Sequence, residues 1–237
     1  MLEISVAYLD ARGRLREVPA AQAAGVPIEE LPRIAPPVAH RGRRGFVTDA
    51  WVSRTGKVIA CGSLRQQRVA AVLDRDSGIA AFSAGPVELR WDEDGRRRAL
   101  QPDFAARRRS GERLLLVLEP QTPGAAWKHR RHVLQETALR TGWELEITAP
   151  PGGTELANLQ LVFGARDPRG RDPGAVETLL SAFARPCRLE DGAAACGLPR
   201  LAAIELAHHL IWRRQLEIDW HTPLLPTSLA RASGVRP

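Results

Sequence analysis

The chain of 237 residues lacks the long apolar segments that mark membrane and exported proteins. No apolar stretch approaches the roughly 20 residues that a membrane span requires. Residues 1–18 are charged early and contain no apolar block of the kind found in signal peptides. We therefore expect a cytoplasmic protein that does not associate with a membrane.

Cysteine is scarce, and the common catalytic and metal-binding motifs are missing. The three cysteines form no C-x-x-C pair, and their odd number argues against a disulfide framework. The six histidines make no zinc pattern, because the adjacent His208 and His209 would point about 100° apart on a helix. No G-x-S-x-G motif or Walker-type loop occurs, so neither α/β-hydrolase nor P-loop chemistry is indicated.

Lysine is nearly absent as well, since Lys57 and Lys128 are the only two, and the net charge of +7 comes almost entirely from arginine. The guanidinium fork matches phosphate oxygens, and a basic chain is consistent with a nucleic-acid partner. Four basic clusters are either solvated faces or phosphate contacts: Arg41/Arg43/Arg44, Arg96/Arg97/Arg98, Arg107/Arg108/Arg109 and Lys128/Arg130/Arg131. The candidate DNA-binding residues are Arg43, Arg44, Arg107, Arg108, Arg130 and Arg131.

Residue patterns up to position 150 predict alternating strands and helices. Residues 1–15 predict a hairpin, residues 20–37 a connector, and residues 46–61 a second hairpin. Ser63 caps a predicted helix, and a second helix over 125–141 ends at Gly142. Strands lie between these helices and after the second one, with Trp127 and Trp143 as expected core residues. This order favours an α/β fold with a mixed sheet flanked by helices.

The stretch "APPGGT" at 149–154 is the best candidate for a domain boundary. Beyond it, helical spacing over 155–162, 175–184 and 199–216 predicts a mainly helical domain. A small strand pair in 216–224 would make this domain winged-helix-like. We therefore divide the chain into an N-terminal hairpin and connector (1–40), a central domain (41–150) and a helical C-terminal domain (151–237).

Residues 97–121 combine two predicted strands with acidic and polar residues at their ends. The first strand carries Pro102-Asp103-Phe104, and the second runs from Leu114 to Leu118 before Glu119-Pro120-Gln121. Metal-dependent nucleases hold a cation with acids at the ends of adjacent strands. The stretch is therefore a nuclease centre, a degenerate one or an ordinary hairpin.

The order of these motifs over about residues 40–235 resembles the TnsA-like heteromeric transposase endonuclease subunits, particularly the actinobacterial ones. The matching features are the basic hairpin, the Ser63-capped helix, a strand pair ending in Trp91, the "PDF" step, the apolar strand ending in proline, a helix and "GWELEI". The resemblance implies a restriction-endonuclease-like PD-(D/E)XK domain that uses Mg²⁺ to nick the 5′ strands at double-stranded transposon ends. It also implies two partners, a TnsB-like transposase and a TnsC-like ATPase.

Several family positions are substituted here. Asp103 matches the aspartate of the family, but Gln66 stands where the helix glutamate is expected. On the second strand the acid position falls on Val117 and the basic position on Glu119. Since Mg²⁺ releases its waters reluctantly, one aspartate would bind it weakly or not at all.

Three hypotheses remain open from the sequence. The first is a degenerate, DNA- and transposase-binding subunit with remnants of the catalytic site at Gln66, Asp103 and Glu119. The second is an active endonuclease with a shifted site, in which Asp103 and Glu119 bind Mg²⁺, Gln121 assists, and Lys128 or Arg130 reaches in from the helix. The third is an unrelated basic DNA-binding scaffold protein whose hairpins only imitate the motif.

Overall fold

We describe a computed structural model of the chain, which covers residues 2–37, 46–169 and 171–234. The chain forms two compact units. The first comprises residues 1–52 and 57–150, and the second comprises residues 53–56 and 151–237. Residues 2–37, which the sequence sets apart as a hairpin and connector, thus belong to the first unit and contribute to its core.

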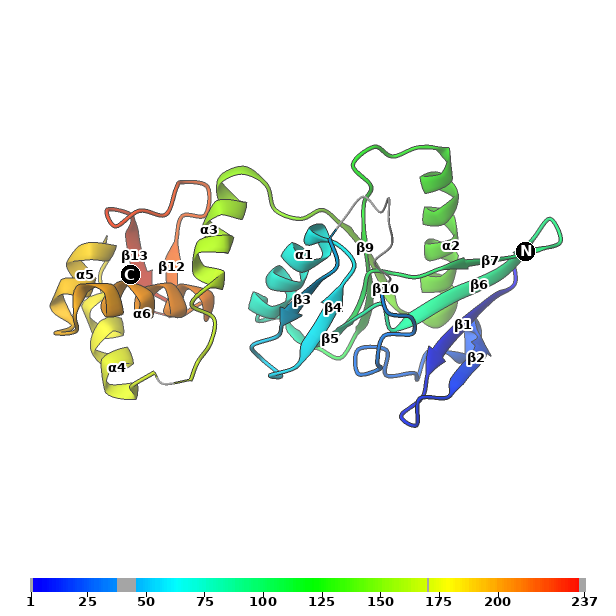
Figure 1. Ribbon diagram of the computed structural model, residues 1–237, viewed down its shortest axis with the longest axis horizontal. Helices are drawn as coiled ribbons and strands as arrows, with labels where there is room; N and C mark the ends of the chain where they lie inside the picture. The colour runs from blue at the N-terminus through cyan, green and yellow to red at the C-terminus, as the bar shows by residue number, and fades with distance from the viewer. Residues whose placement is uncertain (1, 38–45, 170, 235–237) are drawn as a thin grey trace. The chain divides into compact units, whose positions relative to one another are not determined.

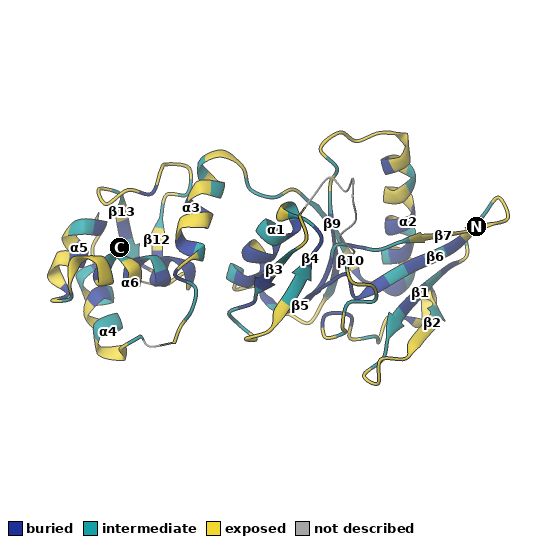
Figure 2. Cartoon of the chain, viewed as in Figure 1, coloured by how far each residue is buried: buried dark blue, intermediate teal, exposed yellow. Residues whose placement is uncertain are grey.

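The first unit contains an antiparallel sheet with the strand order β2-β1-β6-β7 (Figure 1). Its strands are β1 (Ile4–Leu9), β2 (Leu15–Pro19), β6 (Val87–Glu93) and β7 (Arg96–Leu100). Alternation along β1 and β6 sends every second side chain into the core, whereas β2 and β7 are exposed along most of their length (Figure 2). The N-terminal strand is therefore an interior strand of this sheet.

A second four-stranded sheet has the order β10-β9-β8-β5, and it is mixed because β9 and β10 run parallel. Its strands are β5 (Ile79–Ala84), β8 (Phe104–Arg108), β9 (Arg113–Leu118) and β10 (Glu144–Thr148). The separate hairpin predicted over 46–61 is confirmed as β3 (Thr48–Trp51) and β4 (Val58–Cys61). An α/β fold is therefore observed, with the mixed sheet at its centre.

Two helices cover opposite faces of the mixed sheet. Helix α1 (Leu64–Arg75) packs with one set of alternating strand residues: Val69, Ala70 and Leu73 with Phe104, Ala106, Leu114 and Leu116. Helix α2 (Ala125–Thr141) packs with the other set: Trp127, Val133 and Leu134 with Ala105, Leu115 and Val117. A short 3-10 helix, η1 (Ala20–Gln22), joins the core of α2. The expectation that Trp127 and Trp143 are core residues is confirmed.

Both predicted helix boundaries are confirmed, and the local chemistry explains them. The Ser63 hydroxyl accepts a hydrogen bond from the Gln66 N–H, which satisfies one of the first free donors of α1. Gly142 ends α2 in a left-handed conformation with φ of 72°, which glycine adopts without strain.

The expectation of two strands over 97–121 was wrong, and the unit has a further sheet beside the expected mixed one. The stretch holds three strands, and β7 belongs to the first sheet whereas β8 and β9 belong to the mixed sheet. The chain leaves the mixed sheet at Gly85 and returns at Asp103, where the Gly85 N–H donates to the Asp103 carbonyl at 2.9 Å. Gln101 Nε2 donates to the Gly85 carbonyl at 2.8 Å, so these two crossing points are held together.

In its described residues, 53–56, 151–169 and 171–234, the second unit has four helices and a small sheet. Its helices are α3 (Gly153–Phe163), α4 (Pro173–Ala182), α5 (Leu189–Ala195) and α6 (Arg200–Trp212). Its strands are β11 (Cys187–Arg188), β12 (Leu216–Ile218) and β13 (Leu229–Ala232), in the order β11-β13-β12. The strand pair expected within 216–224 was therefore wrong, because β12 pairs with a strand beyond that range.

All three cysteines are free. Across the described ranges, every helix is too short or too polar to cross a bilayer.

Candidate functional site

Asp103 stands at the crossing point that leads into β8, and both of its carboxylate oxygens are engaged. Oδ1 accepts a hydrogen bond from Gln66 Nε2 at 2.5 Å, and Oδ2 accepts one from the Leu118 N–H at 2.7 Å. The side chain therefore joins the first turn of α1 to the end of β9. Two of the positions singled out by the sequence, Gln66 and Asp103, are in direct contact.

The orientation of the Gln66 amide follows from its other partner. Gln66 is buried, and its Oε1 accepts a hydrogen bond from the Gly62 N–H at 2.5 Å. Because that oxygen must face a donor, the NH₂ group faces Asp103, which has only acceptors to offer when ionised. The amide at this position thus completes a hydrogen-bonded chain from Gly62 through Gln66 to Asp103.

Glu119 lies near this pair through its backbone, but its carboxylate is not part of the chain. Its N–H donates to the Thr148 carbonyl at 2.9 Å, which extends the pairing of β9 with β10. Its carbonyl accepts a hydrogen bond from Arg65 Nη2 at 2.6 Å. The side chain is exposed, and within the described residues no hydrogen bond or ion pair connects it to Gln66 or Asp103.

Position 117, where the resemblance places an acid, is part of the hydrophobic core. Val117 is 4% exposed and belongs to the cluster that includes α2, on the sheet face opposite α1. An acid here would have to enter that apolar cluster. Valine therefore fills the position by packing and adds no charge to the site.

Burial raises the pKa of Asp103, and the hydrogen bonds from Leu118 and Gln66 and the charges of Arg33 and Arg65 only partly offset this effect. Arg33 comes from the connector, and its Nη1 donates to the Ala60 carbonyl at 2.9 Å, on the strand that leads to Gly62. Two guanidinium groups therefore act on one carboxylate. Neither arginine belongs to a sequence motif, because only the folded chain brings Arg33 and Arg65 to this point.

The donor set does not fit a magnesium ion. Mg²⁺ prefers octahedral oxygen ligands that include one or two carboxylates. Here the Gln66 side-chain oxygen and both Asp103 oxygens already accept hydrogen bonds from N–H groups. The charged groups that act on Asp103 are the guanidinium groups of Arg33 and Arg65, which would repel a cation. In the part of the chain that the structure describes, no three histidine, cysteine or acidic residues converge in a way that could hold a metal.

The remaining residues of the shifted-site hypothesis stand apart from this pair. Gln121 and Lys128 are exposed, the first in the loop after β9 and the second in the first turn of α2. Among the described contacts, none joins either side chain to Asp103. The structure thus brings Gln66 and Asp103 together and leaves Glu119, Gln121 and Lys128 at the surface.

The candidate DNA-binding arginines fall into three groups. Arg107 pairs with the buried Glu29 at 2.8 Å, and Arg108 pairs with Glu144 at 2.9 Å, so both have acidic partners within the unit. Arg130 and Arg131 are exposed on α2. Arg43 and Arg44 lie outside the described residues.

The first two turns of α2 contain five consecutive lysine, arginine or histidine residues, 128–132, and no acidic residue. Positive charge near a helix N-terminus opposes the helix dipole at a cost of about 0.3–1 kcal/mol per exposed group. That cost fades after the first turn, so it applies to Lys128 and not to Arg130 or Arg131. Among the described contacts, His129 lies 3.1 Å from Glu93, and no ion pair joins Arg130 or Arg131 to an acid.

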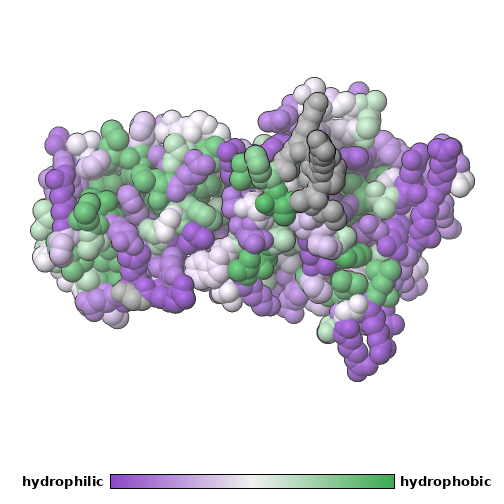
Figure 3. Space-filling model, viewed as in Figure 1, coloured by the Kyte–Doolittle hydropathy of each residue, from purple (hydrophilic) through white to green (hydrophobic). Residues whose placement is uncertain are grey.

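The Arg96/Arg97/Arg98 cluster has acidic partners at two of its arginines, and one of these acids, Glu93, also lies 3.1 Å from His129 Nε2 at the start of α2. Hydrophilic side chains cover the end of the first unit that carries the β6–β7 turn (Figure 3). Arg97 pairs with Glu17, and Arg98 lies 3.5 Å from Glu93. These pairs reduce the positive charge available to a nucleic acid.

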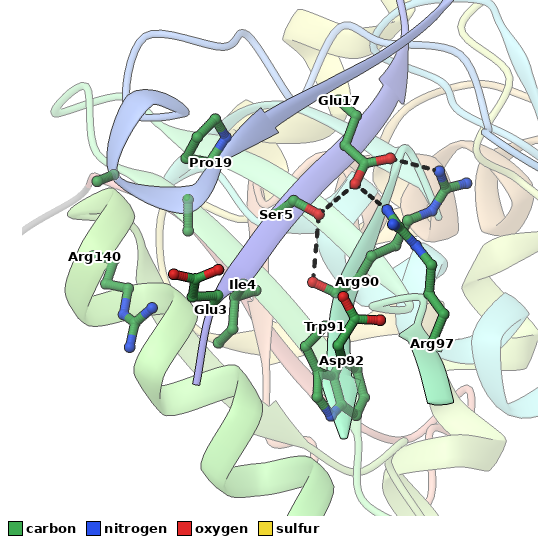
Figure 4. A pocket seen from close by; sticks show the side chains of 12 residues that line it. Glu3, Ile4, Ser5, Glu17, Pro19, Arg90, Trp91, Asp92, Arg97 and Arg140 are labelled. Atoms are coloured by element: carbon green, nitrogen blue, oxygen red, sulfur yellow. Dashed lines mark hydrogen bonds and ion pairs between the residues drawn. The ribbon is translucent and has the colours of Figure 1, made fainter. Parts of the chain in front are cut away.

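A cavity of about 410 Å³ lies beside β1, β6 and α2, away from Gln66 and Asp103. The Glu17 carboxylate in its wall accepts hydrogen bonds from the Ser5 hydroxyl and from the guanidinium groups of Arg90 and Arg97 (Figure 4). This network satisfies the carboxylate within the chain. The cavity has none of the predicted site residues in its lining.

Comparison with known proteins adds no assignment, since no protein-family model matches the chain and no curated protein matches it significantly in sequence.

Proposed function

We propose that this chain is a TnsA-like subunit of a heteromeric DNA transposase that binds DNA and its partner proteins, and whose strand-cleaving centre is degenerate. The observation that carries the proposal is the contact between Gln66 and Asp103. These are the helix and strand positions at which the resemblance expects two metal-binding acids. Their meeting at one point supports a common origin with such a centre, and the amide explains why it no longer holds a metal.

The order of elements in the first unit supports a restriction-endonuclease-like fold. Helix α1 is followed by β5, β8 and β9, which pair antiparallel in sequence order, and then by α2 and the parallel strand β10. The first sheet supplies β6 and β7 as an insertion between β5 and β8. Helices on both faces of a mixed sheet with this order are what the nuclease resemblance requires.

A winged-helix-like second unit is consistent with its elements. The short α5 and the longer α6 follow one another directly, and the paired strands β12 and β13 come next. Only the sequence resemblance supports the TnsB-like transposase and the TnsC-like ATPase as partners. Pull-down of either partner by the purified chain tests that part separately.

DNA binding is the part of the proposal that can be measured most directly. Fluorescence anisotropy with a random duplex should show binding that weakens steeply as salt rises, because arginine–phosphate contacts release counterions. The double variant R130Q/R131Q should bind more weakly than wild type. The matched control R12Q/R14Q, which removes the same charge from the exposed β1–β2 turn, should not.

Cleavage is tested in parallel with supercoiled plasmid and either Mg²⁺ or Mn²⁺. We expect no nicking by wild type, because the donor set at Asp103 does not fit the ion. Metal-dependent nicking that Asp103→Ala abolishes would refute the degenerate centre and favour the shifted-site endonuclease. Binding with no salt dependence would remove the DNA role itself.

A further inference from the structure

We propose that Arg65, together with Arg33, makes the former metal centre a metal-free phosphate-binding site, in which guanidinium groups take the place of the divalent cation. This inference rests on the proposed function, because its ligand is the phosphodiester backbone of DNA. It assigns roles to two residues that the sequence motifs did not single out.

The placement of Arg65 is the first step. Its Nη2 donates to the Glu119 carbonyl at 2.6 Å, which ties the first turn of α1 to the end of β9 across 54 positions of sequence. The resemblance expects a basic side chain from position 119 itself, and this chain has Glu119 there. Arg65 therefore brings a cation from another element to the backbone of the position that lost it.

The capacity of Arg65 to bind an anion is the second step. A guanidinium has five N–H donors, and the bond to Glu119 uses one of them. Arg65 is only partly buried, so the group is within reach of solvent and of a ligand. A planar fork with remaining donors can bind two phosphate oxygens at once, whereas lysine acts as a point charge.

The charge of the group is the third step. Both Asp103 oxygens accept N–H groups, as the oxygens of a carboxylate do, and Arg33 and Arg65 both act on this group electrostatically. Arg33, Arg65 and Asp103 together carry a single net positive charge, before the exposed Glu119 carboxylate is counted. Such a group attracts a phosphate without Mg²⁺. The exposed Glu119 carboxylate, of opposite sign, should weaken that attraction.

The alternative to phosphate binding is a purely structural role for Arg65, in which it only links α1 to β9. Loss of a link lowers stability but leaves the salt dependence of DNA binding unchanged. Loss of a phosphate contact lowers the slope of log K against log salt by about 0.9, the value for one neutralised phosphate in duplex DNA. The salt slope therefore distinguishes the two roles.

The experiment measures anisotropy of a labelled random duplex with the full chain from low to high salt, in EDTA and again with Mg²⁺ at matched ionic strength. We expect wild type to bind equally well in EDTA, R65Q to lose about 0.9 of the slope, and E119Q to bind more tightly. R12Q is the charge-matched control and should match wild type. R65K, which keeps the charge without the fork, should keep the slope but bind more weakly than wild type.

The possible results separately test the phosphate site, its independence of metal, and DNA binding itself. If wild type binds DNA and folded R65Q retains its salt slope, whatever its affinity, the phosphate site is refuted and the proposed function stands. If Mg²⁺ strengthens wild-type binding, the metal-free site is refuted in favour of a metal centre. If wild type does not bind DNA at all, the proposed function fails, and this inference with it. Thermal unfolding of each variant shows whether R65Q is folded. If it is not, E119Q decides the question, because E119Q that binds no more tightly than wild type refutes a phosphate beside position 119.

Discussion

Replacing Gln66 by glutamate tests the centre most directly, because it exchanges one amide NH₂ for an oxygen and changes little else in shape. In the wild type, Nε2 donates to Asp103 Oδ1 at 2.5 Å, while Oε1 accepts from the Gly62 N–H. In Q66E the Gly62 bond can persist, but an ionised carboxylate would face Asp103. Two carboxylates in contact cannot both remain charged without a large cost.

The magnitude follows from two estimates. At about 4 Å and an effective dielectric constant near 20, two like charges repel by about 4 kcal/mol. The pair can avoid this by holding a proton, which at pH 7 costs about 3.7 kcal/mol for a glutamate with an ordinary pKa near 4.3. The proton would restore a donor toward Asp103. We therefore expect Q66E to lower the free energy of unfolding by about 3–4 kcal/mol at pH 7.

The pH dependence has a definite sign. The shared proton raises a pKa of the folded Q66E pair above its unfolded value. The deficit is therefore complete above that raised pKa, and it disappears as the pH falls toward the unfolded value near 4.3. Added Mg²⁺ should stabilise Q66E, by about 1.4 kcal/mol at ten times its Kd, and should leave the wild type unchanged.

Urea unfolding read by tryptophan fluorescence, at pH 5 and pH 8, measures both effects. Hydrogen exchange of the peptide containing Leu118, whose N–H donates to Asp103, localises them. Gln135→Glu, an exposed change of the same chemistry on α2, is the control and should stay within about 0.5 kcal/mol of wild type. A Q66E protein as stable as wild type at pH 8 would refute the contact between Gln66 and Asp103.

Three further predictions concern the second unit. Asn158→Ala should lower the free energy of unfolding by about 2–4 kcal/mol, because this buried amide bonds two loop carbonyls and the Leu224 N–H; an unchanged urea midpoint would contradict this. Gly192→Ala should cost about 1–3 kcal/mol, since its Cβ would lie 2.3 Å from Cζ of Phe183, and adding Phe183→Leu should recover part of the lost melting temperature. Burial lowers the pKa of His209, so the folded unit favours its neutral form. The stability from this group should be fully present above the unfolded pKa of about 6.5 and should decrease as the pH falls below that value. Thermal unfolding at several pH values should show a weaker pH dependence for His209→Gln.

Local patterns predicted the helices well because the determinants of a helix lie close together in sequence. Ser63 caps α1 through a residue three positions away, and Gly142 ends α2 through its own backbone conformation. The break at Gly85 was also readable, since Gly85-Pro86 interrupts the apolar pattern of two strands. Arg33 and Arg65 were missed, because neither belongs to a motif and their effect on Asp103 requires the folded chain.

The sequence by itself determined the position of each main helix, most strands of the first unit, and the absence of acidic residues at positions 66 and 117. Only the tertiary structure decided that β1 pairs with β6, that β7 and β8 enter different sheets, and that the Gln66 amide rather than the Glu119 carboxylate meets Asp103. The physical reason is distance along the chain. A cap or a turn depends on neighbours within a few residues, whereas strand pairing and side-chain convergence depend on how surfaces formed by remote segments pack together.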